Sequence, residues 1–386
     1  MTGGRTGRQL TVAANRLVFI LFTATFRADL RYLGDRMMEL SFTEDQALLR
    51  DSVAQAFRRV GDGEQAWSLF AQMGLLGQAV NEDLGGSGQG VLEACIVAEQ
   101  IGRAGIVAPF STNAIAAAYL LQKLGDEQQK QLLEKMVSGT LRIAIAAPSS
   151  RPSRQVRADR GSNGSSVLTG EILVPEIDDV ELIILRASTD EGMRAFLVEI
   201  GDLGDALTTY AGIDGSTEAT AILDSVKAQP LGASQDCSSA FETAIDRSNM
   251  VICAELIGLM SDLVDRTRDY LKTRTQFGQP LATKQVLRHR LVDMAVAVEE
   301  AQSLMIRAAL ALDDLADIDA RRAASGAVIK VGAAALYVAE DAVQLHGAMG
   351  TTDELGIGAR LKRVIAAKSL MGGRAAHLKR HAALAG

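Results

Sequence analysis

The chain has 386 residues, which is longer than one hydrophobic core usually serves, so two or three packed subdomains are expected. Its 48% hydrophobic and 23% charged residues are typical of a soluble globular protein, and a net charge of -7 argues against nucleic acid as the main partner. Cys95, Cys237 and Cys253 lie far apart without a CxxC pair, which indicates buried thiols in a reducing cytoplasm and no zinc site. His377 and His381 have metal-ligand spacing but no acidic neighbour, so we interpret them as part of a solvated helix face.

Residues 1–37 precede the first pattern that is typical of a folded segment. Arg5, Arg8 and Arg16 come before a short apolar run at 17–22, an order that superficially resembles a secretory signal. The run is too short to span a membrane, and no clear small-x-small cleavage pattern follows it. We therefore expect a poorly ordered leader or a translation start placed too far upstream, and no membrane span.

Residues 38–140 carry a helical pattern and are predicted to form an N-terminal α domain. Thr43 and Gln46 make a capping box, which predicts that a helix begins there. A glycine-rich segment at 81–88 interrupts the helices. It lacks the lysine and the preceding strand of a phosphate-binding loop, so we interpret it as structural.

From residue 141 the pattern changes to short β-like runs. They lie at 167–170, 181–185 and 194–198, separated by Gly, Ser, Asn and Asp. These runs predict a small middle β domain that comprises residues 141–236.

Residues 237–386 are helical again and rich in Ala and Gly, which suits a closely packed bundle that also supplies a subunit interface. Apolar residues at spacings of three and four on both sides of 277–280 predict two amphipathic helices that meet at a polar corner. Arg274 lies just before this corner and Gln285 just after it. An arginine fork suits a phosphate and a glutamine amide suits a heterocycle edge, whereas the plainer alternative is a helical hairpin with solvated charges.

Two motifs in this C-terminal part resemble signatures of one family. Residues 274–281, followed by Gln285 and by residues 289–294, resemble the RxQFGxPI…Q…HRLADM signature of acyl-CoA dehydrogenases. Residues 342–355 resemble the AVQLHGGxGxTxEY element of the same family, at the spacing the family uses. Weaker similarity runs from about Met38 to the C-terminus. It includes the glycine-rich segment at 81–88, whose resemblance to the family's PEExGGxG connector implies a tight turn.

The resemblance implies a mainly α fold with a central β domain: an N-terminal helical bundle, a small β-barrel-like domain and a C-terminal four-helix bundle. It also implies FAD as cofactor, an acyl-CoA substrate from fatty acid or steroid side-chain metabolism, and an electron-transfer flavoprotein as acceptor. In the family's α,β-desaturation a carboxylate removes the α-proton while the flavin accepts the β-hydride. The expected assembly is a dimer or tetramer whose C-terminal helices meet.

The same resemblance assigns six residues to the flavin nucleotide. They are Arg274, Phe277, Gln285, Gln344, Gly347 and Ala348. The first three would hold the pyrophosphate and neighbouring groups across a subunit boundary, and the last three would line the nucleotide from a loop. Gly347 permits close backbone approach, and Ala348 permits it less well.

The middle domain departs from the family's pattern. Where relatives carry a TEPxxGSD loop this chain has residues 146–154, and Glu171 replaces the customary lysine. The family's flavin contacts from this domain are therefore not predicted here. Arg151, Arg154 and Arg157 suit a phosphate, but we favour a solvated surface.

Both positions at which the family keeps its catalytic base lack a carboxylate. One falls on Met371, whose thioether cannot take a proton, and the other falls on Ser248, so no catalytic residue is assigned. Asp246 is the nearest candidate for a relocated base, although residues two apart do not share a helix face. We interpret Glu255 and Glu354 as structural.

Three functions remain open. The favoured one is a base-lacking subunit that lends flavin contacts to a homologous partner. It follows from a resemblance to the small subunits of pimeloyl-CoA and steroid-chain dehydrogenases, whose CAExxG and closing GDxxxHLxR patterns residues 253–258 and 372–380 partly share. The second is a self-sufficient enzyme with Asp246 as base. The third is a scaffold that has lost flavin, against which the retained nucleotide residues argue.

Overall fold

The computed structural model describes residues 42–58, 60, 63–148, 154–160, 166–232, 236–314 and 318–385. The leader predicted for residues 1–37 lies outside these ranges. Residues Thr43–Gly386 form one compact unit, in which helix gives way to strand between Val137 and Ile143, and strand to helix between Pro230 and Ser238. These changes fall near the predicted boundaries, but the division into three domains stays a prediction.

The first part of this unit is helical. Its elements are α2 (Glu44–Phe57), α3 (Gly63–Gln72), η1 (Leu75–Gly77), η2 (Glu82–Leu84), α4 (Val91–Ala104), the π-helix η3 (Phe110–Ala117), α5 (Ala118–Leu124), α6 (Glu127–Lys130) and α7 (Leu132–Val137). The capping box is confirmed, because the Gln46 N–H donates to Thr43 Oγ1 at 3.2 Å and the Thr43 N–H donates to Gln46 Oε1 at 3.1 Å. The glycine-rich segment is a tight turn, since a Cβ on Gly86 would lie 2.1 Å from the Val80 carbonyl oxygen.

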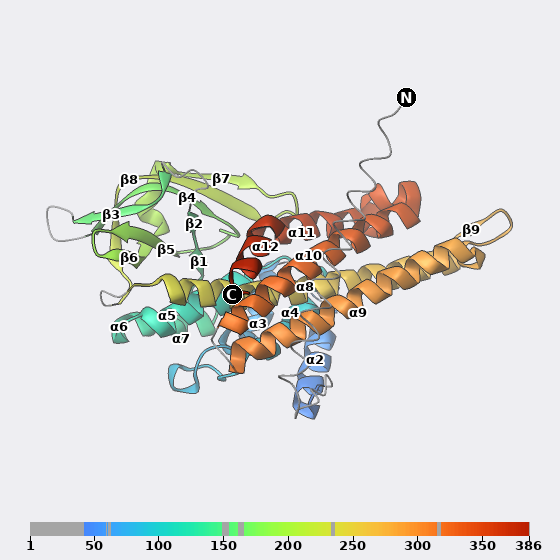
Figure 1. Cartoon of the computed structure of the whole chain (residues 1–386), viewed down its shortest axis with the longest axis horizontal. Helices are drawn as coiled ribbons and strands as arrows, with labels where there is room; N and C mark the ends of the chain where they lie inside the picture. The colour runs from blue at the N-terminus through green and yellow to red at the C-terminus, as the bar shows by residue number, and fades with distance from the viewer. Residues whose placement is uncertain are drawn as a thin grey trace. The chain divides into compact units, whose positions relative to one another are not determined.

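The middle part is a β domain. Its elements are β1 (Ile143–Ile145), β2 (Ala147–Pro148), β3 (Arg157–Arg160), β4 (Ser166–Val174), β5 (Leu182–Thr189), β6 (Gly192–Glu199), η5 (Ile200–Ala206), β7 (Leu207–Ala211) and β8 (Thr217–Pro230). Strand β8 pairs with both β4 and β6, and β3 links β4 to β5, so β4, β3, β5, β6 and β8 form a closed ring (Figure 1). This closure confirms the predicted barrel-like domain. Leu168, Ile183 and Phe196 are among the apolar side chains that fill it.

The last part is a helical bundle, as predicted. Its elements are α8 (Ser238–Thr273), β9 (Thr275–Gln276), β10 (Gln279–Pro280), η6 (Leu281–Thr283), α9 (Gln285–Asp314), α10 (Ile318–His346), η7 (Gly347–Thr351), η8 (Asp353–Leu355), α11 (Ile357–Leu370) and α12 (Arg374–Ala383). Helices α8, α9 and α10 pack against one another, and α11 and α12 pack on α10 (Figure 1). The segment Ile318–Thr351 is long and apolar enough to cross a bilayer, but 61% of its most apolar window is buried in the fold, which is typical of a core helix.

Helices α4 and α8 cross at a pair of glycines. A Cβ on Gly102 of α4 would lie 1.9 Å from the Glu255 carbonyl oxygen of α8, and a Cβ on Gly258 of α8 would lie 1.9 Å from the Glu99 carbonyl oxygen of α4. Each glycine therefore lets the opposite backbone approach closely. Gly258 is the glycine of the CAExxG pattern, and the close contact with the backbone of α4 explains why a glycine stands there.

Asp313, near the end of α9, caps α4 from outside the helix. Its carboxylate accepts from the Val91 N–H at 2.8 Å and from the Leu92 N–H at 3.3 Å, which satisfies donors that a helix start leaves free. Gly90 makes room for it, since a Cβ there would lie 2.5 Å from Asp313 Oδ2. The glycine crossing and this cap both fix α4 to the C-terminal bundle.

Candidate functional site

The polar corner is a hairpin at the end of two long helices. Strands β9 and β10 pair around Phe277 and Gly278, whose φ angles of 53° and 75° are those of a type I′ turn. A left-handed backbone is rare for a bulky residue, and the Phe277 side chain is 90% exposed. Arg274 at the end of α8 and Gln285 at the start of α9 are exposed as well. The corner therefore presents an arginine, an aromatic ring and an amide to a partner molecule.

The loop after α10 presents the other predicted nucleotide residues. Gln344, Gly347 and Ala348 are exposed. Gly347 has a φ of 61°, and no atom lies within 4 Å of the Cβ that another residue would place there. The backbone at Gly347 is therefore open to close approach.

Two contacts bring the corner and the loop to the same end of the bundle. The ring of Tyr270, one turn before the corner, stacks on the ring of His346 at 4.4 Å, and its hydroxyl donates to the His346 carbonyl at 3.3 Å. Arg290 of α9 pairs with Asp341 of α10, with Nε donating to Oδ2 at 3.1 Å. Burial lowers the pKa of His346, so its imidazole stays neutral, and Nδ1–H donates to the Ala342 carbonyl at 2.8 Å.

The two family positions for the base are buried and carry no acid. Met371 ends α11, and its Sδ lies 3.7 Å from Sγ of Cys253 on α8. Ser248 is 6% exposed on the same α8. Burial raises the pKa of Cys253, so this thiol also stays protonated. All three cysteines are buried, as predicted.

Asp246, the candidate for a relocated base, is fully buried and already paired. Both of its carboxylate oxygens accept from the guanidinium of Arg380 on α12, with Nη2 to Oδ2 at 2.7 Å. A bidentate arginine takes one lone pair on each oxygen and fixes the orientation of the carboxylate. Asp246 therefore anchors α12 to α8.

The prediction of a solvated histidine face is wrong for His377, which is buried. Its Nε2–H donates to the Met371 carbonyl at 2.6 Å, because α12 folds back onto the end of α11. His381 bonds the Arg322 carbonyl through Nδ1 at 3.0 Å. The closing pattern of residues 372–380 thus holds α12 in place through His377 and Arg380.

Arg154 and Arg157, two of the three clustered arginines of the β domain, are exposed and pair with neighbouring acids. Arg154 donates to Glu171 at 2.8 Å, and Arg157 pairs with Asp159 and Asp190 at 2.9 Å each. Arg151 lies outside the described residues. Glu171 stands where relatives carry a lysine, and its carboxylate is bound by Arg154 of the same domain.

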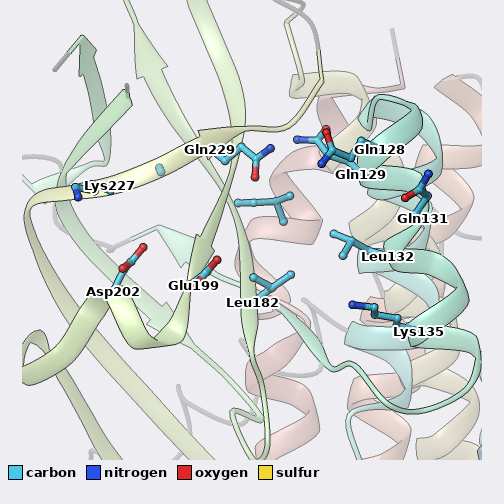
Figure 2. A pocket seen from close by; sticks show the side chains of 12 residues that line it. Gln128, Gln129, Gln131, Leu132, Lys135, Leu182, Glu199, Asp202, Lys227 and Gln229 are labelled. Carbon is cyan, nitrogen blue, oxygen red and sulfur yellow. The ribbon is translucent and has the colours of Figure 1, made fainter. Parts of the chain in front are cut away.

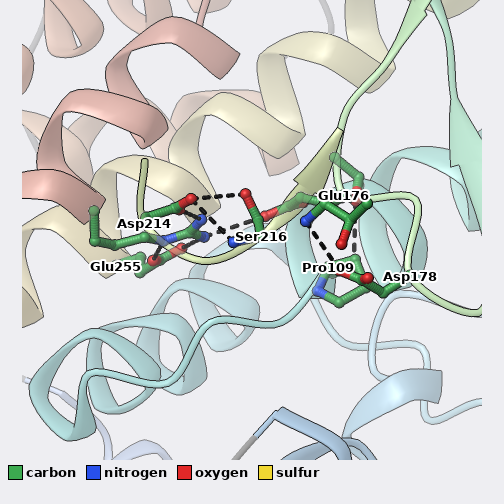
Figure 3. A network of polar contacts seen from close by, with 9 residues as sticks. Pro109, Glu176, Asp178, Asp214, Ser216 and Glu255 are labelled. Atoms are coloured by element: carbon green, nitrogen blue, oxygen red, sulfur yellow. Dashed lines mark hydrogen bonds and ion pairs between the residues drawn. The ribbon is translucent and has the colours of Figure 1, made fainter. Parts of the chain in front are cut away.

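A charged cluster that no sequence pattern indicated joins the β domain to the bundle. Arg363 of α11 donates to Glu255 of α8 at 2.6 and 3.1 Å, to Asp214 before β8 at 2.8 Å, and to Glu176 after β4 at 3.2 Å. All four side chains are at most 7% exposed. Figure 3 shows Asp214, Glu255 and Glu176 approaching one another from separate elements. Glu255 is structural, as predicted, and Glu354 is exposed on η8.

Two cavities of the described part of the chain lie elsewhere. One of about 450 Å³ separates α6 and α7 from the β domain, with Leu132 facing Leu182 and with Gln128 and Lys135 nearby (Figure 2). The other, of about 530 Å³, lies on α2 and α3. Neither is lined by Ser248, Asp246 or Met371.

Comparison with known proteins agrees with this architecture. Residues 43–140 match the N-terminal domain of acyl-CoA dehydrogenases, and residues 239–383 match the C-terminal domain, which together cover more than half of the chain. Acyl-CoA dehydrogenase FadE27 of Mycobacterium tuberculosis is 28% identical over 347 residues, covering 85% of this chain and 89% of the relative. Mitochondrial isovaleryl-CoA dehydrogenase of Pongo abelii is 26% identical over 317 residues, covering 77% and 74%.

Solved structures give the same result. A variant of the Tcur3481-Tcur3483 steroid ACAD has a TM-score of 0.79 at 25% identity, covering 88% of this chain and 97% of that one. The ChsE4-ChsE5 complex from Mycobacterium tuberculosis has a TM-score of 0.78 at 24% identity, covering 89% and 97%. With both of its terminal domains matched and its fold shared along nearly the whole length of these structures, the chain belongs to the acyl-CoA dehydrogenase family.

Proposed function

We propose that the chain is the base-lacking subunit of a hetero-oligomeric, flavin-dependent acyl-CoA dehydrogenase. The observation that carries this proposal is the chemistry at the two base positions, a buried thioether at Met371 and a buried hydroxyl at Ser248. Neither group takes a proton from a carbon acid at neutral pH. The nearest acid, Asp246, is bound by Arg380. A homologous partner chain therefore supplies the base.

FAD is the cofactor of this family, and the exposed end of the bundle fits its nucleotide half. Arg274 offers a planar fork to a diphosphate, and the open backbone at Gly347 permits close approach of the same group. When bound, the flavin supplies a hydride acceptor. The contacts of Tyr270 with His346 fix the corner relative to the loop, so that both are oriented before the flavin arrives.

Exposed apolar side chains support an assembly through the C-terminal helices. Phe277 is 90% exposed, and Val286, Val292 and Val296 of α9 are 65%, 58% and 50% exposed. Apolar side chains gathered at exposed positions mark protein interfaces. We infer a dimer or tetramer in which this surface meets the partner chain. The ChsE4-ChsE5 complex, whose structure this chain resembles, is named after two different chains, which supports a hetero-oligomer.

The remaining parts of the proposal follow from the family. The substrate is an acyl-CoA, of the fatty acid or steroid side-chain kind, and an electron-transfer flavoprotein takes the electrons. Three buried thiols support a cytoplasmic location.

Co-expression with a homologous, base-carrying chain from the neighbouring reading frame tests the proposal. We expect the purified complex to be yellow and to desaturate acyl-CoA, and this chain alone to be inactive. Activity of this chain alone that is lost in Asp246→Asn would instead support the relocated base. A colourless complex would support the scaffold.

Arg274→Ala is expected to remove flavin from the complex without unfolding the chain. Arg274 is exposed, so the free energy of unfolding should change by less than about 0.5 kcal/mol. Flavin content per complex, measured by absorbance, should fall at least about tenfold, because a charge-assisted bidentate bond to phosphate is lost. Lys272→Ala, an equally exposed change on the last turn of α8, is the control and should keep its flavin. Equal flavin in both variants would contradict the assignment.

A further inference from the structure

The Arg363 cluster holds more negative than positive charge. One guanidinium faces three carboxyl groups, those of Glu176, Asp214 and Glu255. A buried carboxylate without full compensation is strongly disfavoured and takes up a proton instead. The geometry of the hydrogen bonds indicates which carboxyl is neutral.

Asp214 and Glu255 have the better contacts with charged or donating groups. Glu255 receives two bonds from Arg363, and Asp214 receives one from Arg363 and a 2.7 Å bond from the Ser216 hydroxyl. Glu176 has a single Arg363 contact, which at 3.2 Å is the longest in the cluster. Glu176 is therefore the least compensated of the three.

The second oxygen of Glu176 lies beside a hydroxyl that has another acceptor. Thr112 Oγ1 is 3.1 Å from Glu176 Oε2 and 3.3 Å from the Pro109 carbonyl oxygen. A hydroxyl has one hydrogen, so it cannot donate fully to both oxygens. With Glu176 ionised, Thr112 donates to Oε2 and the Pro109 carbonyl loses that hydrogen. With a hydrogen on Oε2, Glu176 donates to Thr112 Oγ1 and the Thr112 hydrogen goes to the Pro109 carbonyl, which is always an acceptor.

We propose that Glu176 is held as a neutral acid between Thr112 and Arg363, so that seating the β domain on α8 and α11 takes up one proton. The groups that face Glu176 are Arg363 on α11, Glu255 on α8 and Thr112 on η3. Its backbone φ of 51° is left-handed, which indicates that the surroundings hold the residue in this place. Glu176 therefore joins three elements, η3, α8 and α11, through one titratable side chain.

The way in which stability depends on pH follows from the raised pKa of Glu176. Burial, the largest cause, raises the pKa of Glu176 above the ordinary 4.5, although Arg363 opposes it. The folded chain then holds a proton that the unfolded chain has lost, so this group's contribution to stability is full below about pH 4.5 and is lost as the pH rises through the raised pKa. Glu176→Gln removes that loss because glutamine is neutral at every pH and still accepts from Arg363.

Urea unfolding of the full chain at about pH 5.5 and about pH 8.5 tests the proposal. We expect Glu176→Gln to raise the midpoint at both pH values and to raise it more at the higher one, because the glutamate of the unfolded wild type already ionises above about pH 4.5. Glu64→Gln is the matched control, since Glu64 also pairs with a buried arginine, Arg142, but is 67% exposed. Its effect should be the same at both pH values. A Glu176→Gln midpoint that is lowered equally at both pH values would overturn the proposal.

Infrared spectroscopy supplies a readout that a purely structural role would not move. The wild type at neutral pH should show the carbonyl band of a protonated carboxylic acid, and Glu176→Gln should lose it. Thr112→Val should shift the band by removing its hydrogen-bond acceptor, and Thr112→Ser should restore it. Absence of the band in the wild type, or a band that neither Glu176→Gln nor Thr112→Val changes, contradicts the neutral acid.

Discussion

Arg363→Met is expected to lower the free energy of unfolding by about 3–5 kcal/mol near neutral pH, the usual effect of removing one partner from a buried ion pair. Burial alone would lower the pKa of Arg363, but Glu255, which accepts two of its hydrogen bonds, raises it well above its usual value, so the group stays charged. Without it, the carboxyl groups of Asp214 and Glu255 lose their cation while they remain buried. Since domains are stable by only about 5–15 kcal/mol, a large part of the chain's stability disappears.

Chemical denaturation followed by circular dichroism measures this loss. Lys362→Met, the neighbouring and exposed position on α11, is the control and should change the free energy of unfolding by less than about 0.5 kcal/mol. The loss in Arg363→Met should shrink as the pH falls, because protonation of a carboxyl group removes the negative charge that has lost its cation. If Arg363→Met were as stable as Lys362→Met, the cluster would contribute nothing to the fold.

Gly258→Ala is expected to destabilise the chain by at least about 3 kcal/mol. The new Cβ would lie 1.9 Å from the Glu99 carbonyl oxygen and 2.8 Å from the Arg103 nitrogen. Both atoms belong to the backbone of α4, which cannot turn aside as a flexible side chain can. The two helices must therefore separate, and the buried side chains along the whole crossing lose contact.

Gly332→Ala on α10 is the matched comparison for that change. It is also a buried glycine within a long helix, but the nearest atoms to its new Cβ belong to the flexible side chains of Lys368 and Met371, at 3.8 Å or more. Alanine favours helix over glycine by up to about 1 kcal/mol, so Gly332→Ala should be neutral or slightly stabilising. Thermal unfolding of the two variants in parallel checks both results. Equal losses of stability in the two variants would show that the close approach of α4 and α8 does not cause the destabilisation by Gly258→Ala.

The local features of the fold were predictable from the sequence because neighbouring residues determine them. Thr43 and Gln46 cap a helix within one turn, and the glycine-rich segment at 81–88 forms the expected turn. The corner around Phe277 was also predictable, since helical periodicity stops on one side of it and resumes on the other. The change from a helical pattern to short β-like runs near residue 141 placed the β domain in the correct order between two helical parts.

Contacts between distant residues were not predictable in this way. Glu176, Asp214 and Arg363 each look like an ordinary solvated charge in the sequence, and the structural role predicted for Glu255 came without a partner, because only tertiary packing brings the four together. The same holds for Asp246, whose partner Arg380 lies on the last helix. His377 was misinterpreted as solvated for the same reason, since its burial depends on how α12 folds back.

The α4–α8 crossing has a consequence for how the protein is made. The two glycines are separated by roughly 150 residues, so at roughly 5–20 residues per second Gly102 of α4 leaves the ribosome about 8 to 30 seconds before Gly258 of α8. During that interval the apolar face of α4, which includes Ile101 and Ala94, has no α8 to cover it. Nascent chains of this protein should therefore depend on a chaperone that shelters apolar helices until translation has passed α8.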